Sequence, residues 1–313
     1  MSESEQAGGQ LLVTKDCAAA LELMQAELSK ALNELAQESS GRNLQAGPER
    51  IQHFPSRLDL AFWYVRPTIK RIFHWLFQSE ERSNFTYSIT DENKDYLAAF
   101  CAVITGQASH KMRDYIDELC RDSELREHVL RQRSVLAQQH IPIDPHFDFG
   151  RRLGWYTLVR ALKPKIVIET GVAQGLGSLV LTSALMRNAQ EGHPGYYFGT
   201  ELDRNAGFLF SGKYAEFGKI FYGDSIESLK KLDAVIDLFI NDSDHSAQYE
   251  QQEYEVISSK LSKRAVVLAD NAHVTSKLCD FARSTGREFL YFQERPKDHW
   301  YPGAGIGAAF TKL

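Results

Sequence analysis

A short apolar stretch that runs into a glycine-rich turn constrains the fold of this chain more than any other feature of its sequence. Residues 166–168 read Ile-Val-Ile, which is typical of a buried strand, and the next residues follow the spacing Glu-x-Gly-x-x-x-Gly-x-Gly-Ser. Glycines let a backbone bend sharply and approach a ligand, and a helix predicted at 178–188 would point free N–H groups at that ligand. The spacing differs from the dinucleotide fingerprint Gly-x-Gly-x-x-Gly. Three glycines could also serve a tight connection that binds nothing.

Two further predicted strands end in polar side chains. Residues 196–200 lead into Glu201, and residues 219–222 lead into Asp224 and Ser225. Open α/β sheets bind ligands at the carboxyl ends of their strands, so these side chains are candidates for one shared site. A carboxylate such as Glu201 can accept hydrogen bonds from both hydroxyls of a ribose.

Taken in order, the three strand ends resemble the cofactor motifs of class I S-adenosylmethionine-dependent methyltransferases. The resemblance implies that S-adenosyl-L-methionine is the cofactor, with its methionine end on the glycine-rich turn, its ribose on the second strand end and its adenine on the third. The residues implied to bind it are Glu169, Gly171, Gly175, Ser178, Glu201, Asp224, Ser225 and Asp242.

Beyond residue 144 the sequence alternates between strand and helix patterns. Four more strands are predicted at 236–240, 265–268, 288–292 and 305–310, with helices at 154–162, 248–262 and 275–284. Such alternation predicts an α/β fold with a doubly wound, mainly parallel sheet, here of seven strands. The chain then divides into a helical region, 1–144, and a cofactor-binding domain, 145–313, for which the resemblance implies a Rossmann-like methyltransferase fold that ends in an antiparallel hairpin.

The N-terminal region is predicted to be helical. A helix at 16–38 carries a heptad stripe, which would either dock on the protein or form a dimer seam. The stripe consists of Leu21, Met24, Leu28, Ala31 and Leu35. Three more helices are predicted at 91–105, 109–120 and 123–137. This region would cover the acceptor site, form the interface of a homodimer, or both.

The segment 54–77 is rich in aromatic and basic side chains. Trp63, Tyr64 and Trp75 are interleaved with Arg66, and Pro67 is predicted to begin a new helix. A basic, aromatic, amphipathic segment can lie on a membrane surface. The alternative is a helix that packs on its own protein or covers the acceptor pocket.

A second polar group follows the fourth and fifth strands. Asp242, Asp244 and His245 come after the fourth strand, and Asp270 and Asn271 come after the fifth. Adjacent parallel strands place their carboxyl ends side by side, so these residues are expected to converge. The side-chain oxygens of Asp242, Asp270 and Asn271 suit a hard divalent cation such as magnesium better than zinc.

These two motifs resemble those of metal-dependent O-methyltransferases of the catechol and caffeoyl-coenzyme A type, and equally those of the cephalosporin-hydroxylase-like group. The resemblance implies that Asp242, Asp270 and Asn271 hold a divalent metal that binds and acidifies the acceptor hydroxyl. His245 stands where the catechol-type enzymes have a general-base lysine, so His245 and Asp242 are the predicted catalytic residues. Because histidine replaces lysine, the acceptor or the reaction could differ.

Structural roles are the alternatives for several of these residues. His245 could stabilise its turn by a hydrogen bond to a backbone carbonyl, and Asp270 with Asn271 could form a helix cap or a turn. Trp300 and Tyr301 precede the last strand and would either wall an aromatic acceptor pocket or anchor the hairpin. His273 is a weaker candidate for a supporting group or a second base.

Composition excludes several classes of function. The formal net charge of -5 and pI near 6.1 argue against a general affinity for nucleic acids. Four widely spaced cysteines indicate neither a disulfide framework nor a zinc knuckle. The first ten residues lack the pattern of a secretory signal, and no stretch is apolar enough to span a bilayer. We therefore expect a cytoplasmic protein.

The sequence thus predicts an S-adenosylmethionine-dependent methyltransferase, with metal-assisted transfer to the hydroxyl of a small molecule, in biosynthesis, as the first hypothesis. A metal-independent N- or C-methyltransferase and a non-catalytic methyltransferase-like scaffold are the alternatives. An NAD-type oxidoreductase is disfavoured, because the glycine spacing is wrong and no Tyr-x-x-x-Lys motif follows.

Overall fold

The computed structural model describes residues 53–79, 81, 87–137 and 147–312, together with isolated positions between 19 and 37. The predicted stripe from Leu21 to Leu35 lies outside these residues. The chain divides into two compact units, Met1–Pro67 and Thr68–Leu313. The helices between 91 and 137 belong to the same unit as the sheet. The functional division near residue 144 stays a prediction.

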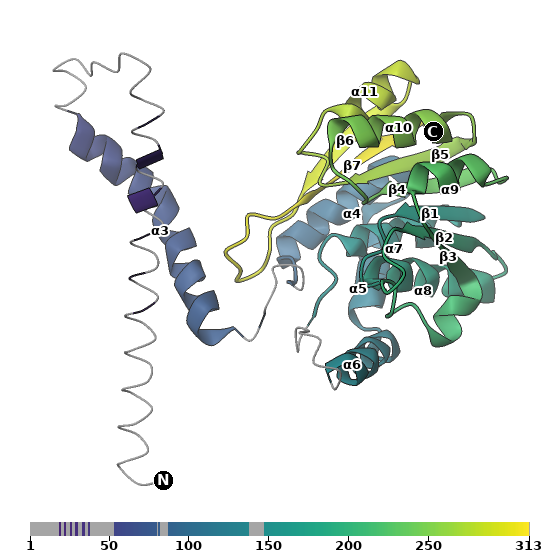
Figure 1. Cartoon of the computed structure of the whole chain (residues 1–313), viewed down its shortest axis with the longest axis horizontal. Coiled ribbons are helices and arrows are strands. Elements are labelled where there is room, and N and C mark those ends of the chain that lie inside the picture. Colours follow the sequence, from purple (N-terminus) through teal and green to yellow (C-terminus); the bar gives the residue numbers. More distant parts are fainter. Residues whose placement is uncertain are drawn as a thin grey trace, which may run out of the picture. The chain divides into compact units, whose positions relative to one another are not determined.

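Within the described residues, seven strands form one sheet in the order β3-β2-β1-β4-β5-β7-β6 (Figure 1). Their bounds are β1 Ile166–Thr170, β2 Tyr196–Glu201, β3 Gly218–Tyr222, β4 Ile236–Asn241, β5 Leu261–Asp270, β6 Glu288–Gln293 and β7 Gly305–Phe310. The first five strands pair in parallel, and β7 lies antiparallel between β5 and β6. The predicted doubly wound, mainly parallel sheet with a terminal antiparallel hairpin is confirmed.

Helices cover both faces of this sheet. They are α4 Asp91–Thr105, α5 Ser109–Cys120, α6 Ser123–Ala137, α7 Arg152–Leu162, α8 Leu176–Gln190, α9 Ser225–Lys231, α10 Ala247–Ser258 and α11 Lys277–Ser284. Val167 and Leu238 belong to a hydrophobic cluster with α4–α8, whereas their chain neighbours Ile168 and Phe239 belong to a second cluster with α9–α11. Because both faces are buried, the central strands are continuous apolar runs rather than alternating ones.

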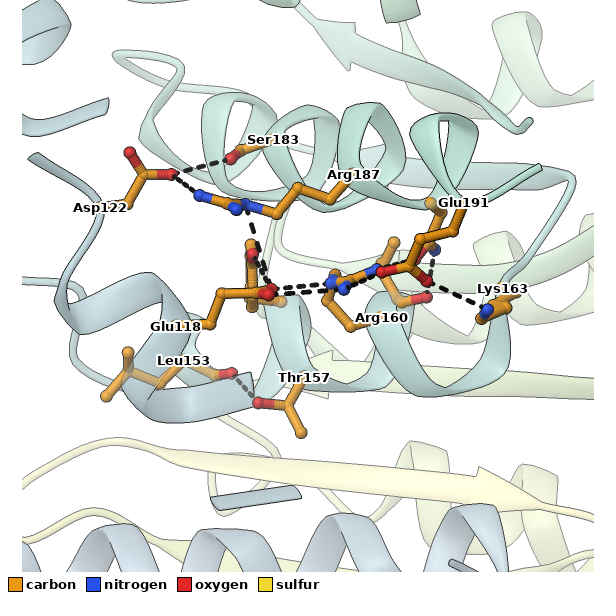
Figure 2. A network of polar contacts seen from close by, with 12 residues as sticks. Glu118, Asp122, Leu153, Thr157, Arg160, Lys163, Ser183, Arg187 and Glu191 are labelled. Carbon is orange, nitrogen blue, oxygen red and sulfur yellow. Dashed lines mark hydrogen bonds and ion pairs between the residues drawn. The ribbon is translucent and has the colours of Figure 1, made fainter. Parts of the chain in front are cut away.

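Buried and half-buried arginines join α5 and the start of α6 to α7 and α8, two of the helices that cover the sheet. Arg160 of α7, whose side chain is 4% exposed, donates to Glu118 of α5 at 2.7 Å and to Glu191, which follows α8, at 2.6 Å (Figure 2). Arg187 of α8 donates to Asp122, just before α6, at 2.9 Å. Removing one partner of a buried ion pair is strongly destabilising. This network therefore helps to explain why α5 and α6 fold together with the sheet.

Helix α3, Phe54–Gln78, runs through Pro67, so the prediction that Pro67 begins a new helix is wrong. A proline removes one backbone hydrogen bond, but the turns on either side can keep the helix intact. Trp63 and Tyr64 are each 75% exposed, while Trp75 near the end of the helix contacts Trp300 with ring centroids 5.6 Å apart. Among the described residues, no helix combines the length and apolar character that crossing a membrane requires.

Some predicted boundaries differ from the observed ones. Helix α10 ends at Ser258 and not at 262, because β5 begins at Leu261 and pairs with β4 from Ile236 onward. The sequence did not predict α9 or a 3₁₀ helix at Gly212–Phe217. These elements have seven and six residues, which is too few to show a helical period.

A glycine pair tests how tightly the turn after β1 is packed. Gly171 (φ +81°) has no room for a side chain, since a Cβ would lie 2.0 Å from the carbonyl oxygen of Asp242. Gly192 has nearly the same φ, +84°, but open space around it. We expect Gly192→Ala to cost about 1 kcal/mol through its positive φ and Gly171→Ala about 1–3 kcal/mol more through the clash. Urea unfolding measures both, and equal losses would contradict the packing described.

Candidate active site

The glycine-rich turn after β1 is packed against the end of β4. Gly171 and Gly175, which precedes α8, both have φ in the left-handed region that favours glycine. The Asp242 N–H donates to the Thr170 carbonyl at 3.0 Å, and Gly171 lies directly against the Asp242 carbonyl. Two groups of predicted site residues, far apart in the sequence, therefore adjoin at the carboxyl edge of the sheet.

Glu169 and Ser178 lie buried beneath this turn. Glu169 accepts a hydrogen bond from Ser178 Oγ at 3.1 Å and another from the Tyr197 hydroxyl, which is itself 2.7 Å from Ser178 Oγ. Burial raises the pKa of Glu169 to about 7, although these hydrogen bonds oppose the rise. Direct contact of Glu169 and Ser178 with a cofactor stays a prediction. Sequence reasoning missed Tyr197, for which its place on a predicted strand was the only signal.

Glu201 connects the turns after β1 and β2. Its carboxylate accepts hydrogen bonds from the backbone N–H groups of Ala173 (2.8 Å), Leu202 (2.8 Å) and Asp203 (3.1 Å). Ala173 has φ +48°, which is uncommon for a residue with a Cβ, and its bond to Glu201 helps to hold it there. For the predicted ribose contact, the Glu201 carboxylate would accept hydrogen bonds from the sugar hydroxyls, either in addition to these N–H groups or in place of some of them.

Asp224 and Ser225 form the start of α9 rather than an open turn. Asp224 caps the helix by accepting from the Glu227 N–H at 2.9 Å, and it also accepts from the Tyr249 hydroxyl at 3.1 Å. Ser225 Oγ is 2.9 Å from the same hydroxyl and donates to Glu253 of α10. Tyr249 and Glu253 were missed, although their spacing of four residues places them on one face of the predicted helix.

The polar ends of β4 and β5 converge as expected. Asp242, His245 and Asp270 each have a potential ligand atom, and these atoms lie within 4.8 Å of one another, the one such group among the described residues. His245 Nε2 is 3.9 Å from Asp242 Oδ1 and 3.2 Å from Asn271 Nδ2. Burial, and then the negative charge of Asp270, raise the pKa of Asp242 well above its ordinary value. His273 is exposed and lies outside this cluster.

An arginine that sequence reasoning missed enters this cluster. Arg151, directly before α7, donates from Nε and Nη2 to the two carboxylate oxygens of Asp270, and the Nη2 bond is 2.6 Å long. The side chains are 6% and 0% exposed. Burial alone would raise the pKa of Asp270, but the guanidinium charge lowers it below the ordinary value. The two residues are 119 positions apart and Arg151 belongs to no motif, so no local pattern could have linked them.

The predicted metal ligands do not present the donor set that a divalent cation needs. Both oxygens of Asp270 are engaged by Arg151, and Asn271 directs its Nδ2 amide nitrogen to Asp270 Oδ2 at 2.9 Å. A cation binds the amide oxygen, whereas Asn271 presents its amide nitrogen to Asp270 and to His245. A guanidinium beside Asp270 also repels a second cation. The potential ligand atoms are close enough together for a metal ion. The orientation of the Asn271 amide and the positive charge of Arg151 do not fit one.

The loop between β6 and β7 packs against the other side of Arg151. Glu294 is buried and accepts hydrogen bonds from the Tyr87 hydroxyl at 2.9 Å and from the Ala304 N–H at 3.0 Å, and Arg151 Nη1 lies 3.8 Å from it. The rings of Tyr87 and Tyr301 are 5.6 Å apart. Together with the Trp300 contact to α3, these contacts anchor the loop, and a role in an acceptor pocket stays a prediction.

A cavity of about 850 Å³ lies away from these residues. It is lined in part by Lys165 and Ile166 at the start of β1, by Val235 and Asp237 at β4, and by Arg264 of β5. The cavity therefore opens near the amino ends of the central strands. Ligands of open α/β sheets bind at the carboxyl ends, so we do not assign this cavity to the candidate site.

Residues 168–272 match a protein family described as a methyltransferase domain. No curated protein sequence matches the chain. Among solved structures, it is similar to a proposed O-methyltransferase from Klebsiella pneumoniae (14% identity, 63% of this chain and 94% of that one, TM-score 0.48). It is also similar to an O-methyltransferase from Bacillus cereus in complex with SAH (14%, 59% and 91%, 0.44) and to TomG from Streptomyces achromogenes, an O-methyltransferase of tomaymycin synthesis in complex with SAM (16%, 62% and 91%, 0.43).

The matched segment runs from β1 to the turn after β5 and contains every residue predicted to bind the cofactor. Together with the strand order, it confirms the predicted class I methyltransferase fold and the prediction of an S-adenosylmethionine-dependent methyltransferase. The roles of the individual site residues stay predictions.

The buried carboxyl of Glu169 gives a pH-dependent stability. Its pKa is raised from 4.5 to about 7, so its contribution is fully present below pH 4.5 and is lost as the pH rises through 7. Comparing wild type with Glu169→Gln, which stays neutral, should show a difference in pH dependence of about 3 kcal/mol across this window. Urea unfolding at several pH values measures it. Exposed Glu227→Gln is the control, and identical pH profiles for wild type and Glu169→Gln would contradict the assignment.

Proposed function

We propose that this methyltransferase transfers a methyl group from S-adenosyl-L-methionine to a hydroxyl of a small molecule, with His245 as the general base. The observation that supports it is the contact between the glycine-rich turn after β1 and the turn of Asp242 and His245 after β4. A cofactor held on the first turn would lie beside a potential base on the second. Gly171 allows this approach because it has no side chain.

In the proposed reaction the acceptor hydroxyl gives its proton to His245 Nε2 as its oxygen attacks the cofactor's methyl carbon. The new O–CH₃ bond forms while the S–CH₃ bond breaks, and the electron pair of that bond returns to sulfur as S-adenosylhomocysteine leaves. Nε2 now faces Asn271 Nδ2 at 3.2 Å, so the acceptor must displace this contact. Positioning the two reactants supplies much of the acceleration, since the cofactor carries the electrophile.

The predicted magnesium ion is not part of this mechanism. Arg151 engages both oxygens of Asp270, and Asn271 presents its nitrogen to the cluster. These contacts therefore favour transfer without a metal, which the sequence analysis considered only for nitrogen or carbon acceptors. Transfer to nitrogen or carbon stays open as an alternative, and no contact of the described residues favours it.

Cofactor binding tests the first part of the proposal. Calorimetric titration of S-adenosyl-L-methionine into the wild-type chain should show micromolar-range binding, and Glu201→Ala should weaken it at least about tenfold, because two charge-assisted hydrogen bonds to the ribose are lost. Asp203→Asn, in the same turn, is the control and should bind as wild type does. Absence of binding to the wild-type chain would favour the scaffold alternative.

The base is tested with acceptors. In a screen of hydroxylated small molecules, His245→Gln should lower kcat by about 10²–10⁴-fold without changing cofactor affinity, since only proton transfer is impaired. His273→Gln removes an exposed imidazole from outside the cluster and should retain wild-type turnover. Equal activity of His245→Gln and wild type on an accepted substrate would exclude His245 as the base.

A further inference from the structure

Arg151 is held in a fixed position by contacts on two sides. Its guanidinium makes a two-point contact with Asp270 on one side, and its Nη1 lies 3.8 Å from the buried carboxylate of Glu294 on the other. The preceding Gly150 has φ +49°, and a Cβ there would lie 3.1 Å from Glu294 Oε1. A planar guanidinium matches a carboxylate at two points, which an ammonium group cannot do. Arg151 is thus built into the cluster.

The charges around Arg151 explain why a cation is needed there. Three carboxylates surround it: Asp270 and Glu294 are completely buried, and the side chain of Asp242 is 14% exposed. Buried carboxylates that lie this close together are stable only with a compensating positive charge or with bound protons. Among the described residues, Arg151 is the cation in direct contact with Asp270.

We propose that Arg151 is a built-in cation that takes the place of the divalent metal predicted from the sequence, so that the chain does not bind such an ion at Asp242, Asp270 and Asn271. Arg151 acts as a positioning residue: it holds Asp270, which in turn accepts from Asn271 beside His245. The exclusion of metal does not depend on the reaction proposed above. Only the statement that turnover needs no metal rests on that proposed function.

Manganese binding to the free protein tests this proposal without cofactor or acceptor. Electron paramagnetic resonance measures free Mn²⁺ during titration of wild type, Arg151→Gln and the double variant Arg151→Gln/Asp270→Asn. The wild-type chain should show no site tighter than about 1 mM, the weak end of oxygen-ligand sites. Arg151→Gln frees the Asp270 carboxylate and should gain one site at least about tenfold tighter, because the guanidinium that engages both of its oxygens is gone. The double variant should lose this site again.

Each outcome decides the proposal. A wild-type site tighter than about 1 mM that Asp242→Asn removes would overturn it, and so would an Arg151→Gln chain that folds but gains no Mn²⁺ site. Circular dichroism and urea unfolding establish that each variant is folded. If Arg151→Gln does not fold, Arg151→Lys replaces it, because lysine keeps the positive charge but loses the two-point contact with Asp270. Like the wild-type chain, Arg151→Lys should bind no Mn²⁺. The wild-type titration by itself still decides whether the native cluster accepts a metal. Failure of cofactor binding would count against the proposed function alone.

Discussion

Parallel pairing of β1 with both β2 and β4 is the constraint on which the rest of the site depends. It places the ends of three strands, far apart in the sequence, next to one another at one edge. The turns that leave this edge must then pass each other closely. Gly171 meets this demand, since any side chain there would occupy the position of the Asp242 carbonyl. The glycine spacing in the sequence is thus a consequence of strand packing as much as of ligand binding.

Burial on both faces of the sheet has a second consequence, which concerns charge. Several carboxylates at the carboxyl edge are buried or partly buried, so each of them needs hydrogen-bond donors or a positive charge beside it. Glu169 accepts hydrogen bonds from two hydroxyls and has a raised pKa, and Asp270 forms an ion pair with Arg151. Glu201 accepts hydrogen bonds from backbone N–H groups. A buried arginine between carboxylates also connects α5, α7 and the end of α8, where Arg160 contacts Glu118 and Glu191 (Figure 2).

Much of the fold could be predicted from the sequence, because apolar runs and helical spacings are local patterns. All seven strands include the predicted segments, although β5 begins four residues early, and Asp242, His245, Asp270 and Asn271 converge because strand order follows from the fold. The partners of these residues could not be predicted. Which buried polar groups pair depends on contacts between distant segments, and a lone arginine before a helix carries no signal that it will reach β5.

The pairing of Asp270 with Arg151 changes what the same strand-end motif can do. A divalent ion is exchangeable and leaves coordination positions for a substrate, whereas a guanidinium is permanent and its donors here are turned toward protein carboxylates. A site of this kind organises its neighbours, and under the proposed function the acceptor is activated by His245, whose side chain is partly exposed. The histidine in place of lysine and the arginine beside Asp270 are then two parts of one arrangement, in which fixed protein charges take over the role of an ion.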